Sequence, residues 1–338
     1  MQNVVPFQEL QPGKRANEWK KYYLAALVIG LLLLFPFMNT SSYLINLLTE
    51  VFIFGIFAMS LDLILGFTGM ASLGHAAFFG LGAYAAGIVA VRYSPDLFIT
   101  LPAAVLVAAL AALLVGLLAL RTSGVYFLML TLAFSQMFYA ATFKWTWLTG
   151  GSDGLSGIPR PVLPFGGDSL INFFDSTNFY LLTLAVFLAS YFLLWRIIHS
   201  PFGQVLIGIR ENEKRMLAIG YETRKFKLAS FVIAGAFGGV AGALNAFYIG
   251  YASPQDLFWA MSGQVLVMVI MGGAGTLIGP VLGAGLFLML QNVVSSYTER
   301  WPIIMGAIFI TFVLAAPKGM VGIYGKVAEK VRCRLWKH

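Results

Sequence analysis

The sequence predicts an all-α membrane protein with about ten transmembrane helices. Three observations support this: an apolar composition, long uncharged segments broken by glycine and proline, and basic residues gathered between those segments. Of the 338 residues, 59% are hydrophobic and 11% are charged, whereas about 25% are charged in an ordinary soluble domain. Mean hydropathy is +0.83. A water-soluble fold of this length needs far more polar surface, so the bilayer is the expected solvent.

The spans follow from the length of each uncharged segment. A hydrocarbon core of roughly 30 Å takes about 20 helical residues. The predicted membrane domain, 22–316, contains spans at 22–38, 43–65, 75–91, 98–120, 124–143, 178–195 and 226–249, two spans within 257–298, and a last one at 301–316.

Residues 257–298 carry no charge, and as one helix they would be about 63 Å long, twice the bilayer. The glycine-rich run that ends at Pro280 lies in the middle of this segment and is expected to break it. Two spans joined by a tight turn are therefore predicted. Re-entrant segments at 66–74 and 272–283 would reduce the total to eight or nine.

The basic residues predict the orientation. With both termini in the cytoplasm, only Arg92, Lys144, Arg160 and Arg300 of the 22 basic residues lie outside, as expected when positive charge stays on the cytoplasmic side. Segment 1–21 is then a cytoplasmic N-terminal segment without the features of a cleavable signal peptide, and 317–338 is a cytoplasmic basic tail. No aromatic-interleaved basic patch indicates nucleic-acid binding. The single cysteine, Cys333, excludes a disulfide within the chain.

Two connecting segments are longer than most loops. The outside loop, 144–177, is rich in glycine and proline and is predicted either to dock a partner through Gly150, Gly151, Ser152 and Asp153 or to be a plain connector. The inside loop, 196–225, is predicted to contain an amphipathic helix at 204–219 that ends at Gly220. One side of this helix would carry Leu206, Ile209, Leu217 and Ala218, and the other side charged residues. Docking on a protein partner and binding to anionic lipid remain equally open from composition.

Two glycine-rich segments are expected at cytoplasmic turns, where they break helices or allow close packing. Their glycines are Gly66, Gly69 and Gly74 in the first and Gly272, Gly275 and Gly279 in the second. Their similarity is a weak indication of an internal repeat.

No catalytic, metal or cofactor site is predicted. The chain lacks a phosphate-binding loop and Cys/His pairs at zinc-site spacing. Ser72 and His75 have helical spacing for a nucleophile and base, but no carboxylate near them would orient the pair, so capping or core roles are expected. Two acids fall inside spans, Glu50 and Asp62, and their roles stay open; Asp62 lies near a helix terminus.

Three stretches, 69–84, 148–161 and 210–227, together resemble the permease subunits of ABC importers for branched-chain (hydrophobic) amino acids. The second contains the run Thr149-Gly150-Gly151-Ser152-Asp153-Gly154-Leu155, and the third contains Ala218-Ile219-Gly220-Tyr221, which matches the family's Ala-x-Gly-Tyr pattern. The resemblance extends over about 43–323.

The resemblance implies the all-helical fold of type II importers in a bacterial inner membrane. It implies a translocation subunit without its own ATPase site, assembled with a second permease, two cytoplasmic ATP-binding subunits and a periplasmic amino-acid-binding protein. Coupling to the ATP-binding subunits would involve Arg210, Glu211, Glu213, Arg215, Ala218, Gly220 and Tyr221. The alternatives are a related permease for urea or short amides, and a stand-alone secondary carrier with broken helices at 66–74 and 272–280.

Overall fold

The computed structural model describes Leu27, 30–37, 41–162, Phe173, 175–315, Gly319, Met320 and Gly322. The chain divides into two units, Met1–Ile45 and Asn46–His338. The first contains the 3-10 turn η1 (Phe35–Phe37) and the beginning of α2. The predicted N-terminal segment, most of the predicted first span and the basic tail with Cys333 lie outside the described residues.

Helices account for nearly all of the described chain, so the predicted all-helical polytopic class is confirmed. The main helices are α2 (Ser42–Asp62), α3 (His75–Arg92), α4 (Leu97–Ala119), α5 (Val125–Lys144), α7 (Ser176–Ile198), α9 (Thr223–Ile249), α10 (Trp259–Gly272), α11 (Ile278–Tyr297) and α12 (Trp301–Ala315). Within the described residues, seven helices are long and apolar enough to cross a membrane, while α10 and α12 are shorter apolar helices. The predicted division of 257–298 into two helices is confirmed, because the chain leaves helical geometry between α10 and α11.

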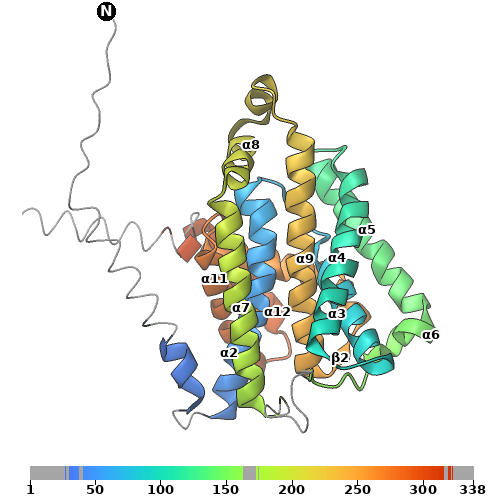
Figure 1. The fold of residues 1–338 in the computed structure, drawn as a ribbon. Coiled ribbons are helices and arrows are strands. Elements are labelled where there is room, and N and C mark those ends of the chain that lie inside the picture. The colour runs from blue at the N-terminus through green and yellow to red at the C-terminus, as the bar shows by residue number, and fades with distance from the viewer. Residues whose placement is uncertain are drawn as a thin grey trace, which may run out of the picture. The chain divides into compact units, whose positions relative to one another are not determined.

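The short elements lie at opposite ends of the second unit (Figure 1). One end carries α8 (Pro201–Ala218), which connects α7 to α9, and we call it the α8 end. The other carries three short helical elements and the antiparallel pairing of β1 with β2, and we call it the hairpin end. Its elements are α6 (Thr146–Thr149), η3 (Gly151–Asp153), β1 (Leu155–Ser156), β2 (Tyr251–Ala252) and η4 (Pro254–Leu257).

The centre of the unit is built by α3, α4 and α9, which pack through small residues. The Cα of Gly242 in α9 faces the carbonyl oxygen of Phe79 in α3 so closely that a Cβ there would collide with it. In the same way, Gly82 of α3 faces the backbone of Gly239. Because helices in lipid associate mainly by van der Waals packing, small residues that admit close backbone approach stabilise such contacts.

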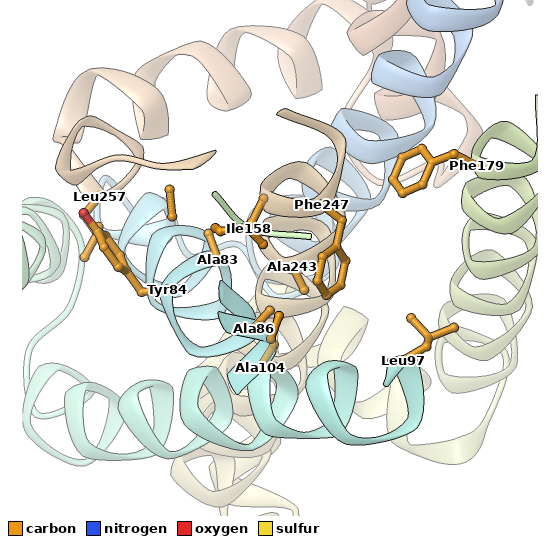
Figure 2. Packing of buried hydrophobic residues seen from close by; sticks show 13 residues of the cluster. Ala83, Tyr84, Ala86, Leu97, Ala104, Ile158, Phe179, Ala243, Phe247 and Leu257 are labelled. Carbon is orange, nitrogen blue, oxygen red and sulfur yellow. The ribbon is translucent and has the colours of Figure 1, made fainter. Parts of the chain in front are cut away.

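The buried core continues toward the hairpin end through both small and large side chains. Figure 2 shows Ala86 of α3 beside Ala104 of α4, with Ala243 and Phe247 of α9 packed close by. Aromatic pairs join further helices to the centre: Phe57 of α2 packs against Phe79 of α3 in a tilted arrangement, with 4.6 Å between ring centroids. The scaffold therefore holds the α8 end and the hairpin end at fixed positions on one packed bundle.

Candidate functional site

Helix α8 begins with Pro201 at its first helical position, where a missing N–H is tolerated. Its regular geometry is interrupted at Asn212, whose backbone angles are φ −160° and ψ 94°. The Oδ1 atom of Asn212 accepts a hydrogen bond from the backbone N–H of Arg215 at 3.0 Å, as an N-cap residue does. Helix α8 is thus two helices, 201–211 and 213–218, joined at a capped kink.

The kink corrects the prediction of a single amphipathic face at 204–219. Leu206 and Ile209, before the kink, are buried against the bundle, whereas Leu217 and Ala218, after it, are exposed. The two pairs do not share one buried face because the helix changes direction between them.

The end of α8 is fixed by a Schellman motif, and Gly220 ends the helix as predicted. Gly220 has φ +95°, its N–H bonds to the carbonyl of Leu217, and the N–H of Tyr221 bonds to the carbonyl of Met216 at 3.1 Å. Next to this motif the side chains of Leu217, Ile219 and Tyr221 are exposed, and we call them the apolar tip. Their exposed fractions are 53%, 64% and 42%.

Two charged residues of the predicted coupling set bind other parts of the same chain. The Nη1 atom of Arg210 donates a hydrogen bond to the carbonyl oxygen of Gly66. Glu213 accepts a hydrogen bond from the Thr223 hydroxyl at 3.0 Å and pairs with Lys227 at 2.6 Å. Glu213 therefore fastens the second half of α8 to the start of α9, while Glu211 and Arg215 are exposed.

Asp62 connects the two glycine-rich segments. It is fully buried at the end of α2, and its carboxylate accepts hydrogen bonds from the backbone N–H groups of Gly275, at 2.7 Å, and Leu277, at 3.4 Å. Because an isolated buried charge is costly, these two donors explain why a carboxylate is stable at this position. The role that the sequence left open for Asp62 is thus to bind the turn 273–277, which precedes α11.

The predicted break and packing glycines lie at close backbone contacts. A Cβ on Gly66 would collide with the backbone nitrogen of Gly275, so the two segments touch directly. A Cβ on Gly272 would collide with the carbonyl of Gly279 where α10 meets α11, and one on Gly74 would collide with the carbonyl of Thr131 in α5. Gly69 has φ +78° and lies against the side chain of Arg210.

A hollow of about 540 Å³ opens at the α8 end. Its walls come from the segment after α2, the α4–α5 connection and α8. The polar lining includes Thr68, Thr122, Arg210, Glu213 and Lys227. Acidic and basic side chains both contribute, so its charges largely balance.

Ser72 and His75 do not form a nucleophile–base pair. The Ser72 hydroxyl is buried and accepts a hydrogen bond from the N–H of Gly74 at 3.2 Å, one residue before α3 begins. The Nε2 atom of His75 lies 2.8 Å from the Ser60 hydroxyl, and that hydroxyl donates to the carbonyl of Phe57. Both side chains serve packing and backbone hydrogen bonding. Among the residues that the structure describes, no group of three His, Cys, Asp or Glu side chains is placed to hold a metal ion.

At the hairpin end, residues 144–162 form an ordered loop with its own hydrogen bonds. Arg92 donates to the carbonyl of Trp147 at 2.7 Å, and the Tyr251 hydroxyl donates to the carbonyl of Asp153 at 2.8 Å. The predicted docking residues Gly150, Ser152 and Asp153 are exposed here, whereas Gly151 is buried.

Asp256 of η4 closes a capping box at the hairpin end. Its carboxylate accepts a hydrogen bond from the N–H of Ser253 within a capping box. Burial raises the pKa of Asp256 to about 6, and the hydrogen bond from Ser253 lowers the pKa only in part.

Several residues of the α8 end were not singled out from the sequence. Asn212 had a detectable signal, because an asparagine before a short charged helical stretch is typical of an N-cap. Lys227 entered only the count of basic residues, and nothing local indicates its pairing with Glu213. The Asp62 contact joins positions more than 200 residues apart, which no local pattern reveals.

Comparison with known proteins gives consistent matches along the chain. Residues 43–314 match the family described as "Branched-chain amino acid transport system / permease component". The chain is 30% identical over 320 residues to the high-affinity branched-chain amino acid transport system permease protein LivM of Escherichia coli (strain K12), covering 89% of this chain and 75% of that protein. It is 28% identical over 202 residues to the autoinducer 2 import system permease protein LsrC of Salmonella typhimurium, covering 55% of this chain and 54% of that protein. No solved structure matches significantly.

The family match covers most of the described residues, including α8, both glycine-rich segments and the ordered loop of the hairpin end. The expected absence of a catalytic role agrees with this family, whose members are the transmembrane components of transport systems. The chain belongs to the family of permease components of branched-chain amino acid transport systems.

Proposed function

We propose that this chain is a transmembrane subunit of an ATP-driven importer for branched-chain and other hydrophobic amino acids in a bacterial inner membrane. It pairs with a second permease and binds two cytoplasmic ATP-binding subunits and a periplasmic binding protein. The main observation in support of this assembly is the apolar tip of α8. Leu217, Ile219 and Tyr221 are exposed beyond the bundle on a helix whose kink and end are both capped.

The tip fits a groove of a protein partner better than a lipid surface. A helix that binds the membrane surface lies along it with one continuous apolar face, and the kink at Asn212 divides that face. An ordered aliphatic and aromatic tip, preceded on the same helix by the exposed charges of Glu211 and Arg215, has instead the composition of an interface, in which apolar contacts are combined with polar ones.

The distribution of basic residues supports a cytoplasmic α8 end. Arg121, Arg196, Lys214 and Arg224 lie in or beside the connections at this end, while Arg92 and Lys144 lie at the end of α3 and of α5 near the hairpin end. The positive-inside rule places the end with more basic residues on the cytoplasmic side of the membrane. The hairpin end would then face the periplasm and present Ser152 and Asp153 to the binding protein, on a loop that its glycines hold in shape.

Co-purification tests the docking proposal. A tagged chain is expressed with its second permease and ATP-binding subunits, as wild type, with Leu217→Asp and Ile219→Asp together, and with Lys214→Asp as a control at an exposed position of the same helix. We expect the double variant to lose the ATP-binding subunits and keep the second permease, because charges at the tip are desolvated on docking. The control should retain both. A wild-type chain that purifies alone and still transports would instead establish the stand-alone secondary carrier.

The solute class is tested separately. The Escherichia coli relative named for branched-chain amino acids matches over 89% of this chain, and the Salmonella typhimurium relative named for autoinducer 2 matches over 55%, which favours the amino acids. Uptake of labelled leucine by the reconstituted complex, with competition by isoleucine, urea, acetamide and autoinducer 2, measures this preference. Competition by isoleucine alone is the expected result, and competition by urea or acetamide would assign the chain to the short-amide alternative.

A further inference from the structure

We infer that Arg210 is a positioning residue that transmits movement of α8 to the turn between α10 and α11, through the carbonyl of Gly66 and the carboxylate of Asp62. The inference rests on the proposed function, in which α8 receives the ATP-driven movement. It assigns Arg210 to the interior of this chain rather than to the surface that binds the ATP-binding subunits.

The first step of the argument is where the guanidinium of Arg210 lies. It donates to the carbonyl oxygen of Gly66, in the π-helical turn η2 (Leu63–Phe67) that ends the second helix. Carbonyls in a last helical turn lack intrahelical partners, and a cation there is favourably placed in the field of the helix dipole. Arg210 therefore satisfies a group that the end of α2 leaves free.

The second step is that the same guanidinium reaches the other glycine-rich segment. The Nη1 atom of Arg210 lies 3.1 Å from the position that a Cβ on Gly275 would occupy. Gly275 in turn donates its N–H to Asp62, and the opposite charges of Asp62 and Arg210 attract each other. The α8 end of α2, the turn before α11 and the first half of α8 thus meet around Gly66 and Gly275. We call this set of contacts, from Arg210 to Asp62, the Arg210–Asp62 hub.

The third step is that the turn held by the hub is strained. Leu277 has φ +53° and is the one non-glycine residue with positive φ among the described residues. Such a conformation is unfavourable for a residue with a side chain and persists only where surrounding contacts enforce it. The hydrogen bond from the N–H of Leu277 to Asp62 is such a contact. A shift of Asp62 would release the turn 273–277. In this way a small shift of Asp62 would be converted into a larger movement of the turn, as happens at elements that can adopt two arrangements.

The fourth step is that movement of the α8 tip has a short path to the hub. Arg210 lies two residues before the kink at Asn212, and the second half of α8 is fastened to α9 through Glu213 and Lys227. The first half of α8 also contacts α7, because Gly203 lies against the carbonyl of Ile198. Displacement of the tip therefore moves Arg210 relative to Gly66, and with it the α8 ends of α10 and α11.

The test uses the complete complex, reconstituted in liposomes with the binding protein, and measures three quantities: ATP-binding subunits retained, ATP hydrolysed and leucine taken up. The variants are Arg210→Ala, Arg210→Lys, Asp62→Asn and the double variant Arg210→Ala with Asp62→Asn. Lys214→Ala, at an exposed basic position on the same helix, is the control. Coupling free energies between sites commonly correspond to changes of roughly 5- to 150-fold.

We expect Arg210→Ala to retain the ATP-binding subunits and to hydrolyse ATP within about twofold of wild type, while uptake per ATP falls by about tenfold or more. Arg210→Lys should recover part of the loss, because it keeps the charge but not the planar geometry of the guanidinium. Asp62→Asn should resemble Arg210→Ala, and the double variant should be no worse than either, since residues that act through one contact are not additive. The control should match wild type.

Three results would overturn the inference: loss of the ATP-binding subunits from Arg210→Ala, a normal ratio of uptake to hydrolysis in that variant, or additive losses in the double variant. If Arg210→Ala fails to accumulate in the membrane, the ratio measured with Arg210→Lys decides in the same way. A wild-type chain that binds no ATP-binding subunits would refute the proposed function instead, so the two failures are distinguishable.

Discussion

At the scale of single residues, the closest backbone contact in the centre of the bundle depends on one missing methyl group. Gly242 of α9 lies against the carbonyl of Phe79 in α3, and the next contact, with the nitrogen of Ala83, is at 3.0 Å from an added Cβ. Gly263 of α10 has a similar helical setting but open space around its Cα. Alanine substitutions at these two glycines therefore separate the effect of helix propensity from the effect of close packing.

We predict that Gly242→Ala lowers the stability of the purified chain by about 1–3 kcal/mol, the usual cost of overpacking. The added Cβ collides with backbone atoms, which have few ways to move. Gly263→Ala should be neutral or slightly stabilising, because alanine is the better helix former. Thermal unfolding of both variants in the same detergent measures the difference, and equal unfolding temperatures would contradict the close contact of α3 with α9.

At the scale of elements, the kinked helix α8 and the turn 273–277 use the same device, a polar side chain that satisfies backbone N–H groups at an interrupted helix. Asn212 does so for the second half of α8, and Asp62 does so for the residues before α11. In each case the side chain fixes the direction in which the next helix leaves.

Asn212→Ala should loosen the apolar tip without unfolding the bundle. Loss of a helix N-cap costs about 1 kcal/mol, which corresponds to about a fivefold change in a local opening equilibrium. Amide hydrogen exchange in residues 213–221 should accelerate by about that factor and stay unchanged in α3 and α9. Asn212→Asp retains a side-chain oxygen acceptor and should exchange like wild type. Equal exchange in all three proteins would show that the kink does not depend on the cap.

At the scale of the whole molecule, the second unit carries α8 at one end and α6 and β2 at the other (Figure 1), and the side chains at these ends differ in chemistry. The α8 end offers an apolar tip surrounded by charges, and the hairpin end offers a glycine-rich loop with exposed Ser152 and Asp153. Exposed aliphatic side chains along α4 between these ends, such as Leu106, Leu110 and Leu114, suit lipid or another membrane helix. The different chemistry of the two ends is the basis for the two docking faces proposed above, one on each side of the bilayer.

Single cysteines at the two ends test the orientation. In a Cys333→Ser background, we predict that Ser152→Cys reacts with a membrane-impermeant maleimide in intact cells from which the outer membrane has been permeabilised. Lys214→Cys should react only after the inner membrane is opened. Both positions are exposed, so access depends on the side of the membrane. The reverse labelling pattern would invert the proposed orientation and place the apolar tip away from the cytoplasm.

The sequence alone determined the class of the molecule and most of its elements. The predicted spans 75–91, 98–120 and 124–143 correspond to α3, α4 and α5 with shifts of one residue at most at either end. Such spans are predictable because hydropathy over about 20 residues is a local property that the bilayer selects. Gly220 and the break between α10 and α11 were predictable for a similar reason, since glycine and proline act on the backbone where they stand.

Only the tertiary structure decided how the functional segments meet. The two glycine-rich segments resembled a repeat in sequence, but in the fold they touch each other, at Gly66 and Gly275. Arg210 looked like one of several surface charges on α8, and it turns inward to Gly66. Asp62 was expected near a helix terminus with its role left open, and its partners are backbone N–H groups of a distant turn. Backbone donors carry no residue-specific signal in a sequence, so packing alone could reveal which of them a buried carboxylate binds.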